Sequence, residues 1–239
     1  MADHLFPKIA SAQGGQPRLI DQPPLLYHVT EPEWDERVRL GMAAYRQSLS
    51  DDRRVLLDRY RLMDSALKVV GIGSVGTRCY IGLLISDEGD PLFLQFKEAG
   101  RSVLEPYTQP SRYENQGQRI VVGQRLMQSS SDIFLGWARG KYGYEFYVRQ
   151  LRDMKMSVPV EQLSTAQLRD YADICGHALA RAHAASGDAA AISGYLGGSD
   201  RFDRALAEFA VAYADQTEGD HAELVKAVRS GRLEAIAEE

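Results

Sequence analysis

The sequence predicts an α+β protein in which a β-rich region, residues 65–155, precedes a mainly helical region, residues 156–239. The β-rich region contains short runs of β-branched, aromatic and apolar residues separated by turn residues, which is typical of strands. From Ser164 onward, apolar residues instead recur every three or four positions, which is typical of amphipathic helices. A Pro-rich extended connector, residues 1–32, and a helical segment, residues 33–64, are predicted to come first.

Composition limits the classes of partner. A chain of 239 residues is long enough for one or two domains with a real core. Its formal charge of −5 argues against nucleic acid, because binding a phosphate backbone needs a basic surface. The sequence shows no signal peptide and no membrane-spanning apolar run, so we expect a cytoplasmic protein without a membrane partner. Cys79 and Cys175 are far apart and predict neither a disulfide framework nor a metal site.

The segment before residue 65 has two parts. Residues 1–32 show no helical period, but their apolar residues predict that the connector packs against the rest of the chain. Residues 33–48 carry apolar residues at helical spacing. A second helix is predicted to start at Asp51, capped by Ser50 or Asp51, and to include Tyr60 and Met63.

A Gly-x-Gly-x-x-Gly pattern is the most informative feature of the β-rich region. It is formed by Gly71, Gly73 and Gly76, with Ser74 inside it, and Lys97 lies one strand downstream. A glycine turn lets backbone N–H groups approach a phosphate, and a lysine supplies a positive charge to the same group. The pattern therefore predicts a nucleotide site.

The same glycine spacing also occurs in dinucleotide-binding domains and in plain hairpins. In a dinucleotide-binding domain the third glycine opens a helix. Here residues 77–85 are rich in β-branched, aromatic and apolar residues, which predicts a strand and therefore a hairpin. The interpretation without a ligand is a bulged hairpin in which Lys97 is a solvated charge.

The third predicted strand places Lys97 on a defined face. Alternation puts Leu92, Leu94 and Phe96 on one face of the strand, and Phe93, Gln95 and Lys97 on the other. A glycine-rich loop over the phosphates, followed by a lysine on the third strand, is the order found in protein kinases. We therefore predict a kinase-like two-lobed arrangement, with an antiparallel five-stranded sheet and one helix followed by a mainly helical lobe.

A helix at residues 118–130 is predicted where kinases place the glutamate that pairs with the strand lysine. No glutamate lies inside this helix, so Glu105, Glu114, Gln118 and Gln124 all remain candidates for pairing with Lys97. Strands at residues 132–137 and 144–151, joined by a glycine turn, complete the sheet. Residues 149–155, which include Leu151, would then cross to the helical lobe, where kinase-like folds let backbone groups meet adenine.

The helical region is predicted to contain a helix of four or five turns after Ser164, another capped by Ser199, and a last one capped by Asp220. Asp188 follows a glycine and is the one candidate for a catalytic residue, because aminoglycoside-type kinases have a similar loop. The histidine that should follow is missing and residue 193 is serine instead of asparagine. Asp188 is therefore interpreted as a turn or cap residue.

Several segments together resemble the bacterial family called domain of unknown function 2252. The resemblance runs from about Phe6 to the C-terminus and is densest at residues 68–78, 95–99, 123–128, 146–151 and 180–188. Longer members of that family carry, further upstream, segments similar to the catalytic and metal-binding loops of small-molecule kinases. The resemblance implies a circularly permuted kinase-like protein, of which this chain looks like the C-terminal portion.

Two functions are predicted from these observations. The first is the nucleotide-binding portion of a kinase-like phosphotransferase with ATP and Mg²⁺ as cofactors, catalytically incomplete as this chain. Phosphoryl transfer also needs metal-holding and orienting residues, which a missing or separately encoded N-terminal portion would supply as a partner. The alternative is a non-catalytic binding or regulatory module with the same fold.

Overall fold

The computed structural model describes residues 6, 8–11, 16–71, 76–151 and 157–235. The chain divides into two compact units, Met1–Ser186 and Gly187–Glu239. The first unit contains the sheets and helices α2 to α5, and the second contains helices α6 and α7. The prediction of an α+β protein is confirmed.

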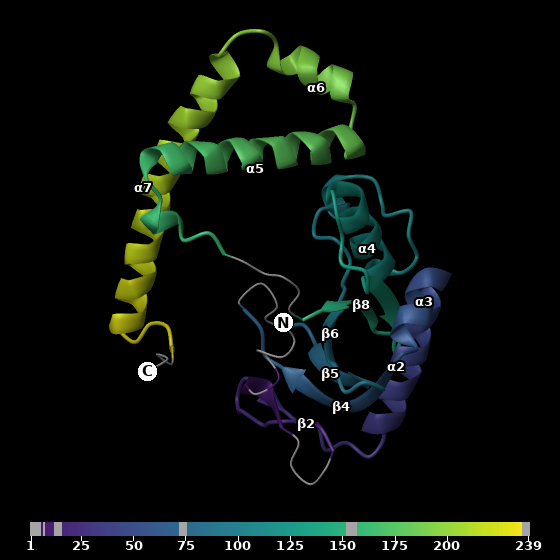
Figure 1. Cartoon of the computed structure of the whole chain (residues 1–239). Coiled ribbons are helices and arrows are strands. Elements are labelled where there is room, and N and C mark those ends of the chain that lie inside the picture. The colour runs from purple at the N-terminus through teal and green to yellow at the C-terminus, as the bar shows by residue number, and fades with distance from the viewer. Residues whose placement is uncertain (1–5, 7, 12–15, 72–75, 152–156, 236–239) are drawn as a thin grey trace. The chain divides into compact units, whose positions relative to one another are not determined.

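The centre of the first unit is an antiparallel sheet of six strands in the order β3-β4-β5-β6-β8-β7 (Figure 1). The strands are β3 (Leu26–Tyr27), β4 (Tyr60–Lys68), β5 (Cys79–Ser86), β6 (Pro91–Glu98), β7 (Gly136–Arg139) and β8 (Glu145–Gln150). The predicted number of five strands was too small, because Leu26 and Tyr27 of the N-terminal segment pair with the end of β4. Strands β1 (Ala10–Ser11) and β2 (Arg18–Leu19) form a separate two-stranded sheet.

Apolar clusters cover the two faces of the large sheet. On one face, Leu92 and Leu94 of β6 pack with residues of α2 (Trp34–Ser48) and α3 (Asp51–Leu57). On the other face, Phe93 packs with residues of the N-terminal segment, among them Leu19 and Leu26. This confirms both the predicted alternation along β6 and the prediction that residues 1–32 pack against the rest of the chain.

The second helix is shorter than predicted. Helix α3 ends at Leu57, and β4 begins at Tyr60. Leu62 then packs on the α2 face of the sheet and Met63 on the opposite face, which is the two-residue period of a strand. The apolar residues that suggested a longer helix thus belong to both faces of the first strand of the glycine hairpin.

The strand predicted at residues 132–137 is β7, which begins only at Gly136. Asp132 lies in a turn, where its carboxylate accepts the backbone N–H groups of Phe134 at 2.8 Å and Gln150 at 2.6 Å. These side-chain hydrogen bonds satisfy two backbone N–H groups that would donate to a neighbouring strand if β7 were longer. The glycine turn to β8 is confirmed, and Gly143 there has a φ of 81°.

The predicted helices after β6 are present. Helix α4 (Gln116–Met127) begins after Asn115, whose side chain accepts the N–H of Gln118, and packs against β7 and β8. Helix α5 (Thr165–Ser186) has 22 residues, about six turns, and is longer than predicted. Short 3-10 helices, η3 (Glu105–Tyr107) and η4 (Val160–Gln162), lie in the connections.

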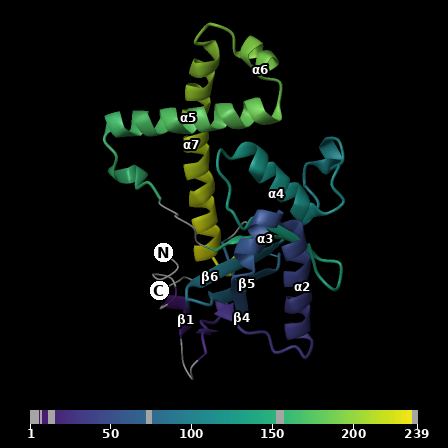
Figure 2. The ribbon, with the colours of Figure 1, turned by 45° about the vertical axis from the view of Figure 1, so that its right-hand side comes forward.

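The second unit contains α6 (Ala189–Leu196) and α7 (Arg201–Arg229). The two helices predicted after Ser199 are one continuous helix (Figure 1 and Figure 2). Asp220 does not cap a helix start, because its carboxylate accepts the side-chain N–H of Gln216 one turn earlier within α7. Within the described part of the chain, no helix has the length and apolar character needed to cross a membrane.

A histidine and two carboxylates tie the N-terminal segment to the sheet. His28, just after β3, lies 2.7 Å from Asp21 through Nδ1 and 3.0 Å from Asp64 of β4 through Nε2. Asp64 also accepts the backbone N–H of Leu19 in β2 at 2.8 Å. Burial opposes the charged imidazole, but the hydrogen bonds and charges of Asp64 and Asp21 outweigh it and raise the pKa of His28.

This arrangement predicts how stability depends on pH. Because the folded-state pKa is raised above the usual value of about 6.5, the contribution of His28 is fully present below pH ~6.5 and is lost as pH rises through the folded-state pKa. We expect urea unfolding between pH 5.5 and 8.5 to show this decrease. The His28→Gln variant should lose that part of the pH dependence. Asp64→Asn should reduce it, and an unchanged slope in both variants would contradict the assignment.

Candidate functional site

The glycine turn and Lys97 meet at one end of the sheet. Lys97 of β6 lies directly opposite Cys79, the first residue of β5 after the turn, and on its other side opposite Tyr147 of β8. Gly71 and Gly76 border the turn, whereas Gly73 and Ser74 lie outside the described residues. Gly76 has a φ of 79°, a left-handed conformation that favours glycine. Since a strand follows this turn, the dinucleotide-binding alternative is excluded.

On the face of the sheet that carries Lys97, six side chains lie near the end at the glycine turn. They come from four neighbouring strands and form what we call the basic face: Lys68, Cys79, Gln95, Lys97, Tyr147 and Arg149. Gln95 is buried at its centre, where its side-chain Nε2 lies 3.3 Å from the Cys79 Sγ. Its Oε1 accepts from the Arg149 Nε at 3.2 Å. Gln95 therefore links the buried thiol to one of the three cations.

The electrostatics of the basic face are dominated by positive charge. Burial raises the pKa of the Cys79 thiol, against the opposing effects of Lys97, Gln95, Lys68 and Arg149. Burial likewise raises the pKa of Tyr147, so both groups are neutral at pH 7. Among the described residues, no carboxylate forms an ion pair with any of the three cations. Three half-buried cations that pair with no carboxylate of the described residues favour binding of an anion.

The candidates for pairing with Lys97 are placed elsewhere. Glu105 in η3 forms an ion pair with Arg101 at 2.9 Å, and Gln124 lies in the third turn of α4. In the part of the chain that the structure describes, neither contacts Lys97 through a hydrogen bond or ion pair, and the same holds for Glu114 and Gln118. The pairing of one of these four residues with Lys97 stays a prediction.

The remaining predicted site residues occupy structural positions. Leu151 packs against the apolar cluster that Phe93 forms with the N-terminal segment, and its N–H donates to the carbonyl of Phe93 at 2.9 Å. The rest of the predicted crossing, residues 152–155, lies outside the described residues. Asp188 caps α6 by accepting the N–H of Ala191 at 3.0 Å, as expected for a cap residue. The described residues contain no group of three or more His, Cys, Asp or Glu side chains placed to hold a metal ion.

Lys68 and Arg149 are the two cations of the basic face that sequence reasoning missed as site residues. Lys68 ends β4 immediately before the glycine turn, and its two-residue spacing from the buried Ala66 marks it as a residue of that face. Arg149 was not recognisable in the same way, because β8 becomes the neighbour of β6 only in the folded sheet.

The fold and this site define an α+β protein with an antiparallel sheet that carries a basic face beside a glycine turn. The chain belongs to the family described as an uncharacterized protein conserved in bacteria (DUF2252), which it matches over residues 1–227. The identification from the sequence motifs is thus confirmed. Comparisons with curated proteins and with solved structures found no match.

Proposed function

We propose that the basic face binds the phosphates of a nucleotide, and that the protein is the ATP-binding portion of a kinase-like phosphotransferase. One observation carries the proposal: Lys97 lies opposite the residue that follows the glycine turn, with Lys68 and Arg149 on the same face and no carboxylate paired to them among the described residues. A di- or triphosphate supplies the negative charge that this face lacks.

The arrangement of elements supports a kinase-like interpretation. Strand β4, the glycine turn, strand β5 and the lysine strand β6 follow one another as neighbours in the sheet. Helix α4 comes next in the chain, before the remaining two strands. In protein kinases the glycine loop covers the phosphates and the lysine of the third strand pairs with them. The proposal includes the two-lobed arrangement, with the helical region as the second lobe.

Each group has a defined role in this proposal. Backbone N–H groups of the turn bordered by Gly71 and Gly76 contact phosphate oxygens, as do the ammonium of Lys97 and the guanidinium of Arg149. Bound Mg²⁺ neutralises further phosphate charge. The catalytic and metal-holding residues are supplied by another portion of the protein or by a separate chain. A cytoplasmic location, where ATP is abundant, is part of the proposal.

Calorimetric titration with ATP, with and without Mg²⁺, tests this function. We expect Lys97→Met to weaken ATP binding about tenfold to a hundredfold, because a charge-assisted hydrogen bond to phosphate is lost. Adenosine, which has no phosphate, should bind both proteins equally. Lys141→Met is the matched control, since Lys141 pairs with Glu33 at 3.0 Å and is not part of the basic face. Absence of ATP binding by the wild-type protein would overturn the proposal.

The position of Asp188 favours a second candidate function, a non-catalytic binding or regulatory module. Its carboxylate serves as the cap of α6, so the one residue suggested as catalytic has a structural role. This alternative predicts a melting temperature that is independent of nucleotide. It also predicts that Lys97→Met changes the stability of the protein only through altered side-chain packing. Thermal melts with and without ATP and Mg²⁺ separate the two functions, since a tight nucleotide site raises the melting temperature with ligand concentration.

A further inference from the structure

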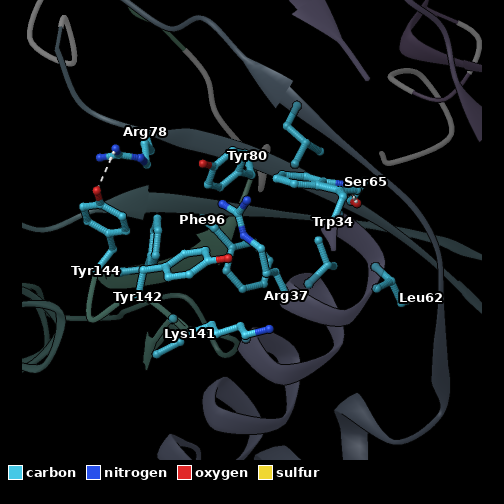
Figure 3. Close-up of a pocket in the computed structure, with 17 residues that line it drawn as sticks. Trp34, Arg37, Leu62, Ser65, Arg78, Tyr80, Phe96, Lys141, Tyr142 and Tyr144 are labelled. Atoms are coloured by element: carbon cyan, nitrogen blue, oxygen red, sulfur yellow. Dashed lines mark hydrogen bonds between the residues drawn. The ribbon is translucent and has the colours of Figure 1, made fainter. Parts of the chain in front are cut away.

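A concave site lies beneath α2, on the face of the sheet opposite the basic face. It is a cavity with a volume of ≈ 80 Å³ for the centres of water-sized molecules, several times the roughly 15 Å³ that holds one water. Figure 3 shows aromatic rings from α2, β5, β6 and the β7–β8 turn around it, and a ring of β8 also lines it. These rings are Trp34, Tyr80, Phe96, Tyr142, Tyr144 and Phe146. The cavity has about half of the roughly 150 Å³ of a cavity that holds benzene, so a ring enters it only in part, against aromatic surfaces on which it can stack.

Three of the residues that line the cavity are glycines, namely Gly41, Gly82 and Gly140. Trp34, Val38, Gly41 and Tyr45 form one stripe of α2 at helical spacing, and all but Tyr45 line the cavity. A Cβ built on Gly41 meets no other atom within 4 Å, so this position opens onto free space. Gly82 of β5 lines the opposite wall. Glycine inside a helix is unfavourable relative to alanine, and Gly41 leaves this part of the cavity wall without a side chain.

The charged residues that line the cavity are cations, and each of them is paired with a carboxylate outside the lining. Arg37, Arg78 and Lys141 line it, and no aspartate or glutamate is among the lining residues. The Arg37 guanidinium lies 5.5 Å from the ring centroid of Trp34 and 5.2 Å from that of Tyr142 (Figure 3). Since Glu31, Glu98 and Glu33 pair with these cations, the preference for an anion rests on donors of the cations that no described residue accepts.

Arg37 is the cation of the cavity lining whose guanidinium has N–H donors that no described residue accepts. Its Nη1 pairs with Glu31, but its Nε and Nη2 make no hydrogen bond with any described residue. Arg78 is engaged more fully, by Glu98 and by the hydroxyl of Tyr144, each at 3.0 Å. Lys141 lies 3.0 Å from Glu33 and 3.7 Å from Glu36. The remaining donors of Arg37 are thus the natural contact for an acidic group on a ring that enters the cavity.

From these observations we propose that the cavity under α2 binds a small planar aromatic carboxylate. The ring stacks among Trp34, Tyr80 and Phe96, and the carboxylate accepts hydrogen bonds from Arg37. The cavity is separate from the basic face, since the lining residues Tyr80 and Phe96 alternate with Cys79 and Lys97 along the same strands. The inference does not depend on nucleotide binding at that other face.

Calorimetry with three matched probes tests the ligand class. Indole-3-acetate is the anion, indole the neutral ring and tryptamine the cation. We expect indole-3-acetate to bind the wild-type protein with a Kd of about 1 mM or lower, at least tenfold more tightly than tryptamine. Failure of indole-3-acetate to bind up to several times that concentration would overturn the proposal, as would equal affinity for tryptamine.

Two variants locate the site. Arg37→Gln should weaken indole-3-acetate binding about tenfold and leave indole binding unchanged. Arg46→Gln is its control on the same helix, because Arg46 pairs with Asp58 and does not line the cavity. Gly41→Met fills the cavity with a side chain that favours helix, so binding of both ring compounds should be lost while the protein stays folded. Retained binding in Gly41→Met overturns the proposal even if Arg37→Gln fails to fold.

Discussion

Replacing Tyr45 with alanine is expected to lower the free energy of unfolding by about 3–5 kcal/mol, because a large side chain is removed from a closely packed core. Tyr45 of α2 is completely buried and packs edge-on against Phe96 of β6, with ring centroids 5.9 Å apart. Its hydroxyl donates to the carbonyl of Phe134 at 2.6 Å. One side chain thus joins α2, the centre of the sheet and the segment before β7.

The hydroxyl and the ring of Tyr45 make separable contributions. Burial raises the pKa of Tyr45 far above that of an exposed tyrosine, so the phenol remains a neutral donor throughout the working pH range. Tyr45→Phe keeps the ring but leaves the Phe134 carbonyl without its donor, at a cost of about 1–3 kcal/mol.

Urea unfolding of Tyr45→Ala and Tyr45→Phe measures how much free energy of unfolding each variant loses. Tyr107→Ala is the control, because that side chain is 85 % exposed and its loss should change the free energy of unfolding by less than about 0.5 kcal/mol. A Tyr45→Ala variant as stable as the control would show that α2 does not depend on this contact.

Replacing Gly117 with alanine is the second substitution with a large expected effect. A Cβ at this position would lie 2.1 Å from the carbonyl oxygen of Phe146 and 2.7 Å from its carbonyl carbon. Both atoms belong to the backbone of β8, which cannot turn aside as a side chain can. Helix α4 and β8 must therefore separate, and we expect a loss of about 3 kcal/mol or more.

Gly123 provides the matched control in the same helix. A Cβ there meets no atom within 4 Å, so Gly123→Ala should stabilise the protein by up to about 1 kcal/mol through helix propensity alone. Thermal and urea unfolding of the two alanine variants measures the difference. Equal stability of the two would contradict the close approach of α4 to β8.

The glycine hairpin shows what sequence reasoning achieves for the site. Apolar and β-branched residues after Gly76 excluded a helix there, and alternation along residues 92–97 placed Lys97 on the face opposite Leu94, as the structure confirms. The boundary of β4 was wrong, because the apolar residues Tyr60, Leu62 and Met63 fit helical spacing as well as a strand buried on both faces. Short apolar runs are ambiguous in this respect.

The set of residues that form the basic face could not be predicted from the sequence. Arg149 lies more than fifty residues after Gln95, and an arginine on a strand looks like any exposed charge until its neighbour is known. The aromatic cavity was missed for the same reason, since Trp34, Tyr80 and Tyr142 come from three separate segments that only the packing of α2 on the sheet brings together.

The sequence by itself determined the α+β class, the family, most of the elements and the face on which Lys97 lies. These follow from local spacing, because the side-chain period of a helix or strand is a property of consecutive residues. The tertiary structure decided the sixth strand, the grouping of three cations on one face of the sheet and the cavity under α2. These depend on contacts between distant segments, which are set by strand order and by the fit of side chains in the folded protein.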